Sequence, residues 1–207
     1  MTDPKSPSQA EPTRHAQRSA AMRVRICEAA VRCLDAHGYA ETTLARIQAE
    51  AAVSRGALMY HFTDRHDIIA AAAARLLGQS LRPIEARKAA VRPIPARALM
   101  QEIWDRVVNT AGGRAMLEIL IACRTDAALN RRLAPQLRAW DRASLASITG
   151  LYAGAGQASD DAEVLWSIAR SFVRGLIIHE QFVSSPEYLH RMLMRFADLI
   201  DAQLQPR

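Results

Sequence analysis

Aromatic side chains and alternating patterns are scarce in this sequence. Phe, Trp and Tyr supply 5% of the 207 residues, although 50% of the residues are hydrophobic. Strands favour aromatic and β-branched residues in alternation, whereas helices repeat their apolar residues every three or four positions. The shortage of strand signals excludes a β-sandwich or barrel and predicts an all-α protein of about nine helices.

Cysteine is equally scarce, and long apolar runs are missing. Cys27, Cys33 and Cys123 are odd in number and form no C-x-x-C pair. This argues against a disulfide framework or a zinc site and indicates free thiols in a reducing compartment. No apolar run has the length of a membrane span, and the polar stretch from Met1 to Ala21 lacks the apolar segment of a secretory signal. We therefore expect a cytoplasmic protein.

Lysine is nearly absent from a chain that is nonetheless basic. Only Lys5 and Lys88 occur among 27 basic residues, the formal net charge is +6 and the pI is about 9.8. Such a charge suits a polyanionic partner without requiring one. Arginine matches phosphate and guanine better than lysine does, but GC-rich coding produces the same excess. The charge alone therefore does not establish nucleic-acid binding.

Motifs of catalysis and of metal or cofactor binding are missing or incomplete. The segment 179–183 begins with H-E but has Val183 where an H-E-x-x-H zinc motif needs its second His. The E-x-x-H at 187–190 has no second copy, which a helical di-iron site requires. The glycines of 154–156 lack the third Gly and the preceding strand of a dinucleotide loop. We therefore expect no enzyme, no metal site and no cofactor.

Prolines divide the chain into a tail and two helical parts. Three prolines among the first 12 residues oppose helix formation and predict a disordered basic tail over 1–18. A basic connector over 82–97 contains three more, the first of which should end or kink a helix, and marks a boundary between 19–82 and 83–207. Apolar spacing predicts helices at 19–36, 44–51, 54–61, 64 to about 82, 96–110, 113–123, 126–152, 161–183 and 186–204.

Local signals indicate where several of these helices begin or end. Gly38 suits the left-handed position after a helix. Asp64 and Asp67 form a D-x-x-D variant of the capping box. Asp160 or Asp161 is expected to cap the penultimate helix, and Pro186 suits the first turn of the last one.

The stretch 42–62, TTLARIQAEAAVSRGALMYHF, is the most informative part of the chain. Its apolar spacing predicts a helix over 44–51, which Thr42 or Thr43 can cap, and Ser54 can cap a second helix that runs to about residue 61. Two helices joined by so short a break must cross steeply, as in a helix-turn-helix, whose second helix enters the DNA major groove. The stretch therefore indicates DNA binding.

The N-terminal part resembles the DNA-binding domain of the TetR family of transcriptional regulators. The residues that carry the resemblance are Ile26, Ala30, Leu34, Gly38-Tyr39, Thr42-Thr43, Ile47, Val53-Ser54-Arg55-Gly56-Ala57-Leu58, Tyr60-His61-Phe62 and Asp64-Arg65 before an Ile-Ile pair. The rest of the chain resembles the family only in the number and length of its helices. Three residues depart from the usual pattern: Ala52 replaces a turn Gly, Met59 a Tyr, and Arg65 a Lys.

The resemblance and groove chemistry together assign roles to the exposed residues. Arg55 is the candidate for base readout, because arginine binds guanine O6 and N7 with two hydrogen bonds. Gly56 would let the helix approach closely, and the Ala57 methyl would meet a thymine methyl. Candidates for phosphate contacts are Thr43, Arg46, Ser54, Tyr60, His61 and Arg65, with Arg14 and Arg18 as a basic arm. Ser54 as a cap alone, Arg46 as a solvated charge, and Tyr60 and His61 as packing residues remain alternatives.

The resemblance also implies a homodimer on a near-palindromic operator and a small hydrophobic effector that releases the repressor. The expected dimer interface consists of Leu165, Ile168, Phe172, Gly175, Leu176, Leu189, Met192, Leu193, Phe196 and Ile200. Candidate pocket residues, for which plain core packing is the alternative, are Met100, Trp104, Met116, Leu120, Cys123, Trp140 and Trp166. A ligand- or metal-binding helical bundle with a degenerate DNA-binding domain is the alternative function.

Overall fold

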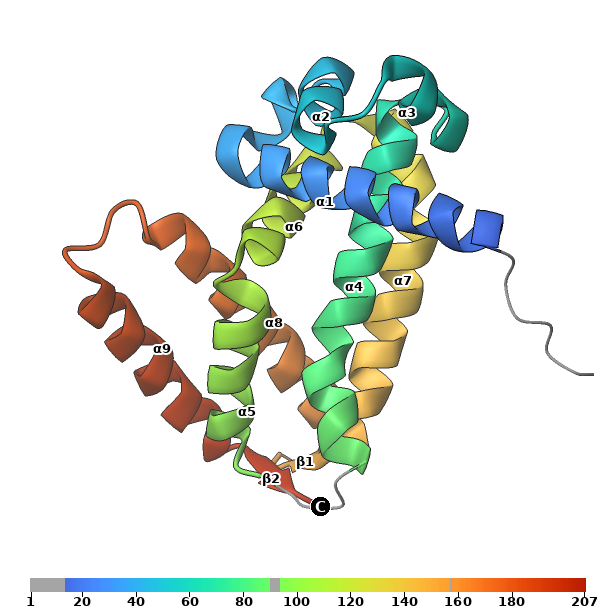
Figure 1. Ribbon diagram of the computed structural model, residues 1–207. Helices are drawn as coiled ribbons and strands as arrows, with labels where there is room; N and C mark the ends of the chain where they lie inside the picture. Colours follow the sequence, from blue (N-terminus) through green and yellow to red (C-terminus); the bar gives the residue numbers. More distant parts are fainter. Residues whose placement is uncertain (1–13, 90–93, 157) are drawn as a thin grey trace, which may run out of the picture.

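The computed structural model describes residues 14–89, 94–156 and 158–207 (Figure 1). The helices of the N-terminal half are α1 (Arg14–Glu41), α2 (Leu44–Ala51), α3 (Arg55–His61) and α4 (Arg65–Ala89). The C-terminal half contains α5 (Ala96–Ile103), the π-helical segment η1 (Trp104–Val108), α6 (Ala111–Ala122), α7 (Ala127–Thr149), β1 (Tyr152–Gly154), α8 (Asp161–His179), α9 (Pro186–Asp201) and β2 (Leu204–Pro206). The prediction of an all-α protein is confirmed.

The helices form two bodies that the long α4 connects. Helices α1, α2 and α3 lie at one end, with α1 crossing the top of α4, while α5, α8 and α9 gather at the other (Figure 1). Helices α6 and α7 stand between them, α6 against α1 and α7 alongside α4 (Figure 1). A movement of α4 or α6 therefore reaches both ends of the molecule.

The first helix is longer than its sequence predicts. It begins at Arg14, so residues 14–18 of the expected tail are helical, and residues 1–13 lie outside the described part. Gly38 has φ 71° and ψ 176°, which confirms its positive φ, and one further turn follows it to Glu41. The helical backbone is therefore broken at Gly38 as predicted, and α1 consists of two helical pieces that meet there.

The expected break at Pro83 is wrong. Helix α4 contains Pro83 and continues to Ala89. The proline removes one backbone hydrogen bond, but Pro83 and Ile84 are both buried, and this packing holds the helix together. One continuous helix thus runs from the α1–α3 end to the opposite end, where the sequence predicted a boundary between 82 and 83.

The C-terminal half of the chain differs in several features from what the sequence predicted. The π-helical turns of η1 interrupt a helix expected over 96–110, and β1 pairs with β2 in antiparallel register. Pro186 stands in the first turn of α9 as predicted. Asp160 makes no capping hydrogen bond, whereas Asp161 accepts one from the Gly156 amide at 2.8 Å, so the expected cap is wrong.

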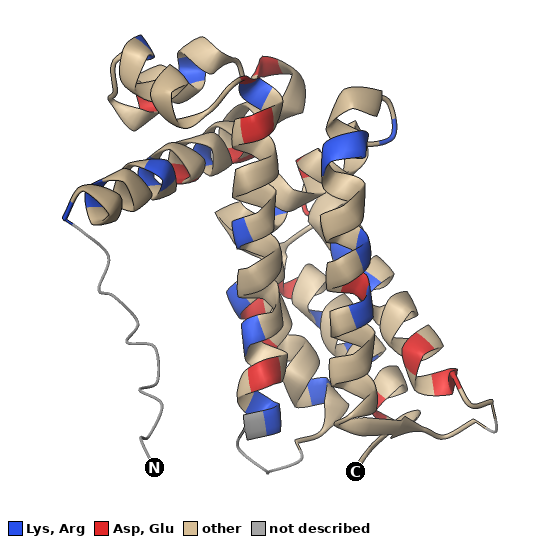
Figure 2. Cartoon of the chain, turned by 90° about the vertical axis from the view of Figure 1, so that its right-hand side faces the viewer, with Lys and Arg blue, Asp and Glu red and all other residues tan. Residues whose placement is uncertain are grey.

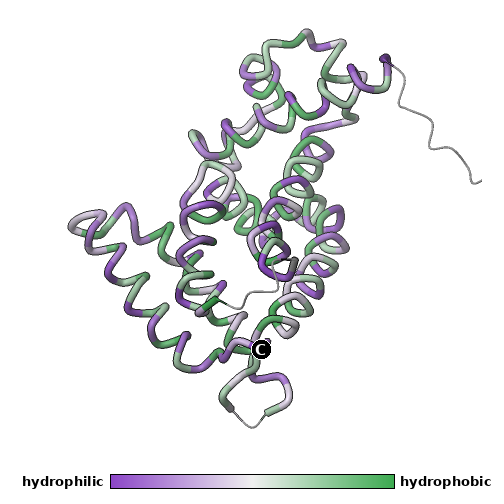
Figure 3. The backbone as a smooth tube through the Cα atoms, turned by 60° about the horizontal axis from the view of Figure 1, so that its bottom comes forward, coloured by the Kyte–Doolittle hydropathy of each residue, from purple (hydrophilic) through white to green (hydrophobic). Residues whose placement is uncertain are grey.

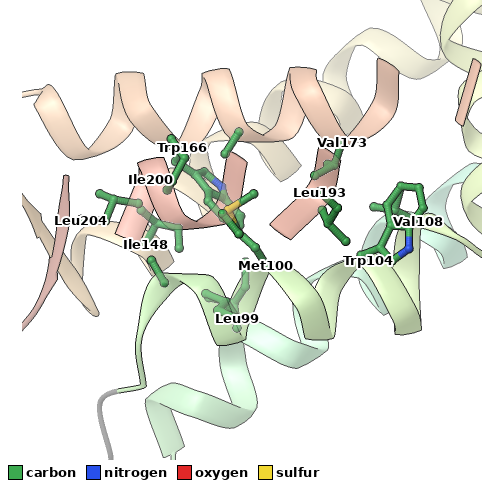
Figure 4. Close-up of a cluster of buried hydrophobic side chains, with 14 of the residues drawn as sticks. Leu99, Met100, Trp104, Val108, Ile148, Trp166, Val173, Leu193, Ile200 and Leu204 are labelled. Atoms are coloured by element: carbon green, nitrogen blue, oxygen red, sulfur yellow. The ribbon is translucent and has the colours of Figure 1, made fainter. Parts of the chain in front are cut away.

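Buried side chains form three clusters along the molecule. The first joins α1, α2, α3 and the start of α4 through small residues and aliphatics, with Phe62 as its aromatic member. The second connects α1 and α4 with α6 and α7. The third, the largest, fills the space between α5, η1, α8 and α9 (Figure 4).

Candidate DNA-binding surface and ligand cavity

The turn between α2 and α3 has the geometry of a helix-turn-helix. Thr43 caps α2 by accepting from the Arg46 amide at 3.2 Å, and Ser54 caps α3 by accepting from the Ala57 amide at 3.1 Å. Ala52 connects them in the left-handed conformation, with φ 48° and ψ 52°. Among the described residues it is the only one other than glycine with positive φ. The turn forms although its usual glycine is absent.

Two arginines of α1 hold the turn and the end of α3. Arg25 donates from Nη2 to the Ala52 carbonyl at 3.3 Å. Arg23 donates to the carbonyl of His61, and its guanidinium lies 4.2 Å from the centre of the Phe62 ring. The sequence did not predict either role, because nothing near an arginine on a helix surface indicates which distant residue it contacts.

The outer face of α3 is exposed and lacks intramolecular partners for its charge. Arg55 is exposed and makes no ion pair or hydrogen bond with any described residue. A Cβ on Gly56 would meet nothing nearer than the Ser54 hydroxyl at 4.0 Å, so the backbone is open to close approach. Met59 is 43% and Tyr60 71% exposed, whereas Leu58 and Phe62 point into the first cluster.

The other residues predicted to contact DNA differ in their exposure and in their intramolecular partners. Thr43 and Ser54 are exposed caps, and exposed Arg46 pairs with Glu41 at 3.2 Å. Half-buried His61 meets the ring of Tyr60 edge-on, with 5.0 Å between ring centres. The positions expected to form a basic arm, 14 and 18, lie in the first turns of α1, along which basic residues recur (Figure 2).

Arg65 has a structural role that its sequence position did not reveal. Its Nε donates to the Thr42 carbonyl at 2.6 Å, and its Nη2 donates to the Tyr39 carbonyl. The guanidinium also lies 4.1 Å from the centre of the Tyr39 ring. Arg65 therefore fastens α4 to the segment before α2, and these donors are not available for the expected phosphate contact.

A polar cluster connects the α1–α3 end to α7. Asp126 caps α7 by accepting from the Leu129 amide at 2.9 Å, and it also accepts from the Tyr39 hydroxyl at 2.6 Å. His66 lies 2.9 Å from the same carboxylate. These hydrogen bonds, with that of Leu129 the strongest cause, lower the pKa of Asp126. Burial, followed by the hydrogen bond to Asp126, raises the pKa of Tyr39 to about 12.

Two ion pairs and one hydrogen bond complete this junction. Arg114 of α6 binds both carboxylate oxygens of Asp35 at 2.6 and 3.2 Å, and Arg132 of α7 binds both of Asp64 at 2.7 and 2.6 Å. The hydrogen bonds from Arg132 lower the pKa of Asp64. The Tyr39 amide donates to Glu118 of α6 at 3.0 Å. Helices α6 and α7 thus hold the body that carries α3.

A cavity of about 130 Å³ lies among α4, α5, η1, α6, α7 and α8. Three predicted pocket residues, Met116, Trp140 and Trp166, line it. Trp140 donates to Ser80 and Trp166 to Ser144, each at 2.9 Å. The remaining lining residues include Leu76, Leu77, Leu81, Ile84, Ile103, Val107, Val108, Val173, Arg106, Arg170 and Arg174.

The other four predicted pocket residues do not line this cavity. Met100 and Trp104 belong to the buried cluster around α5 (Figure 4). Cys123 packs at the edge of the second cluster, and Leu120 is half-buried. Plain core packing, the alternative for these positions, explains Met100 and Trp104 fully.

Several residues of the expected dimer interface are buried within the chain. Leu176, Leu189, Leu193 and Ile200 are at most 5% exposed, so their side chains are not available to a partner. Ile168 is 49% exposed, and half-buried Phe172 and Phe196 stack with 3.9 Å between ring centres. Leu165, Gly175 and Met192 are half-buried, which leaves an apolar strip on α8 and α9. Hydrophobic and hydrophilic residues alternate along the helices, as in amphipathic helices (Figure 3).

Comparisons with known proteins agree with this arrangement. Residues 26–72, from α1 into α4, match the model of the family described as bacterial regulatory proteins, tetR family. The HTH-type transcriptional repressor AcnR of Corynebacterium diphtheriae is 27% identical over 188 residues, which cover 88% of this chain and 91% of AcnR. The family model thus identifies residues 26–72 as a DNA-binding domain of the TetR family of transcriptional regulators. This family is not a class of enzymes.

Solved structures show that the C-terminal helices share the TetR-family fold. A TetR-family regulator from Cytophaga hutchinsonii matches with a TM-score of 0.67 and 16% identity, over 94% of this chain and 98% of its own. The multidrug binding protein EbrR, complexed with imidazole, matches with a TM-score of 0.59 and 21% identity, over 93% of this chain and 97% of its own.

The described part of the chain lacks two kinds of feature. Within the described ranges, no three His, Cys, Asp or Glu side chains come together in a group that could hold a metal ion. No helix in the described part of the chain is both long and apolar enough to cross a membrane.

Proposed function

We propose that this protein is a cytoplasmic repressor of the TetR family that binds a near-palindromic operator as a homodimer and is released by a small effector. The observation that carries the proposal is the outer face of α3, where exposed Arg55 has no partner among the described residues while Ser54, Arg23 and Arg25 fix the helix beneath it. A guanidinium presented in this way suits guanine in the major groove.

The dimer follows from the number of bases that one helix reads. A single seven-residue helix contacts too few base pairs to select one site in a genome. A two-fold dimer doubles the contacts and places two recognition helices about one turn of DNA apart. The apolar strip of exposed Ile168 and half-buried Phe172 and Phe196 on α8 and α9 is the surface that we assign to this contact.

The cavity supplies a route from effector to DNA. Thr110, Gly112 and Gly113 at the start of α6 line it, and Arg114 and Glu118 of the same helix bind α1. A ligand that favours another position of α6 would therefore move the body that carries α3. It releases DNA only if it binds the DNA-incompetent arrangement more tightly.

A titration of DNA binding tests the repressor proposal. The protein is titrated against the intergenic duplex upstream of its own coding sequence and against a random duplex of equal length, at physiological salt. We expect a preference on the order of 10³ or more, which Arg55→Ala reduces and Arg138→Ala on exposed α7 leaves unchanged. Equal binding to both duplexes with a steep salt dependence would show only a basic surface and would contradict the proposal.

A further inference from the structure

The cavity wall carries a positive charge that its apolar lining does not explain. Arg106, Arg170 and Arg174 line the cavity, whereas its lining contains no Asp or Glu. Arg106 is 73% exposed and pairs with Glu102 at 3.2 Å, so water and this carboxylate screen its charge at the surface. Arg170 and Arg174 lie one turn apart on α8 and are more enclosed. A single carboxylate, Asp141, faces both of them.

The guanidinium of Arg170 is only partly satisfied. Its Nη2 donates to Asp141 at 2.7 Å and to the Ser167 hydroxyl at 3.3 Å. Its Nε and Nη1 are buried and have no acceptor among the described residues. Arginine stays charged in proteins, and a buried donor without an acceptor is costly. The wall therefore lacks acceptors for two donors of a charged group, and a negatively charged acceptor suits such donors best.

Arg174 adds a second unbalanced charge at the same place. Burial, followed by the nearby charge of Arg170, lowers the pKa of Arg174. Both guanidiniums lie over the ring of Trp140, at 5.0 Å for Arg170 and 5.5 Å for Arg174 from its centre. The ring attracts both cations through its face. It does not accept hydrogen bonds from the N–H groups, which point outward in the plane of each guanidinium. An anion could supply these acceptors.

The size and walls of the cavity limit the rest of the ligand. Its volume of about 130 Å³ is close to that of an engineered cavity of about 150 Å³ that holds one benzene ring. The N–H groups of Trp140 and Trp166 already have hydroxyl acceptors. The walls therefore offer a ligand apolar contact, with the arginines as the charged exception.

We propose that the effector is a small monocarboxylate with one compact apolar group, such as an aromatic ring, whose carboxylate binds Arg170. That the ligand acts as an effector rests on the proposed function, whereas the binding of the ligand does not. Nε and Nη1 lie on different edges of the guanidinium, so one carboxylate oxygen would accept from one of these two donors in a charge-assisted hydrogen bond. The neighbouring charge of Arg174 would add to the attraction. The ring would lie between Trp140 and Trp166. The cavity lining contains no Asp or Glu that could bind a positively charged ligand.

Binding of three probes with the same ring tests the proposal. Benzoate, benzamide and benzylamine are titrated against the full chain without DNA, by calorimetry and by the fluorescence of the two cavity tryptophans. We expect benzoate to bind at least tenfold more tightly than either of the others, a difference of about 1.4 kcal/mol. In Arg170→Gln the preference should fall below twofold, while Arg138→Gln, which removes an exposed charge from α7, should keep it.

Three results would overturn the proposal. They are the absence of saturable benzoate binding at millimolar concentration, equal binding of benzamide or benzylamine by the unmodified chain, and an unchanged preference in Arg170→Gln. Thermal unfolding shows whether Arg170→Gln folds, and Arg174→Gln, which should weaken benzoate alone, replaces it if it does not. Because no DNA is present, failure here leaves operator binding intact, and a protein that binds no operator can still show the preference.

Discussion

The two ends of the molecule each contain an arginine with unpaired donors, but one arginine is exposed to solvent and the other is buried. Arg55 stands exposed on α3, where water satisfies its donors until DNA arrives. Arg170 lies against the cavity with two buried nitrogens that no described residue satisfies. The first arrangement costs the fold little, whereas the second destabilises the empty protein. The comparison indicates that one end is built to receive a partner from solvent and the other to enclose one.

The largest expected effect concerns the support of α3. Phe62 is 2% exposed, and Arg23 stacks on its ring. Replacing Phe62 with alanine should lower the free energy of unfolding by about 3–5 kcal/mol, because it opens a cavity in a small core. Chemical denaturation measures this loss. Tyr60→Ala, which removes a 71% exposed ring, should change stability by less than about 0.5 kcal/mol; equal losses would show that α3 is not supported through Phe62.

A smaller effect is expected at the cavity. Ser144 is 1% exposed and accepts from the Trp166 indole N–H. Ser144→Ala should cost about 1–3 kcal/mol, because the buried N–H loses its acceptor. The same substitution at Ser171, which is exposed on α8, is the control. If both variants unfold at the same denaturant concentration, the indole has another acceptor and the cavity wall is less fixed than described.

The junction between the two ends should depend on pH. The pKa of Asp126 is lowered in the folded state, so its contribution is complete above the usual carboxyl pKa and is lost as the pH falls through the folded pKa. Asp126→Ala should cost about 0.5–2 kcal/mol at neutral pH, the range for a lost helix cap, and less in acid. Urea denaturation from pH 7 to pH 3 measures this. Asp105→Ala, at an exposed site, should show a difference that does not vary with pH.

The smallest effect concerns the turn before α3. Ala52 pays for its left-handed conformation, which costs a residue with a Cβ roughly 1–2 kcal/mol. Ala52→Gly should therefore stabilise the protein by up to about 1 kcal/mol after the extra chain entropy of glycine is subtracted. Ala49→Gly in exposed α2 should have the opposite sign and a similar size. Thermal unfolding that shifts in the same direction for both variants would contradict the strained turn.

The sequence predicted the α2–α3 region residue by residue, because its signals are local. Thr43 and Ser54 cap helices that begin at the next residue, and the turn at Ala52 follows from the spacing around it. The role of Arg65 was not predictable in this way. Its acceptors, the carbonyls of Tyr39 and Thr42, lie 26 and 23 positions earlier in the chain.

The cavity was predictable only in part for the same reason. Trp140, Trp166 and Met116 were found because bulky apolar residues on the middle helices are few. Arg170 was missed because the prediction considered only apolar side chains, and because its contacts with Asp141 and Trp140 of α7 lie about 30 positions away in the chain and have no local signal. The continuous α4 was missed because packing of Pro83 and Ile84 overrides a local helix breaker.

The central claim, that Arg55 reads a guanine in the major groove, is tested most directly by a double-mutant cycle with the DNA. Each guanine of the operator is replaced in turn by 7-deazaguanine, which lacks N7, and binding is measured for the unmodified protein and for Arg55→Ala. We expect one guanine per half-site at which the protein and DNA changes are not additive, with a coupling of about 1–3 kcal/mol. Additive effects at every guanine would contradict the claim.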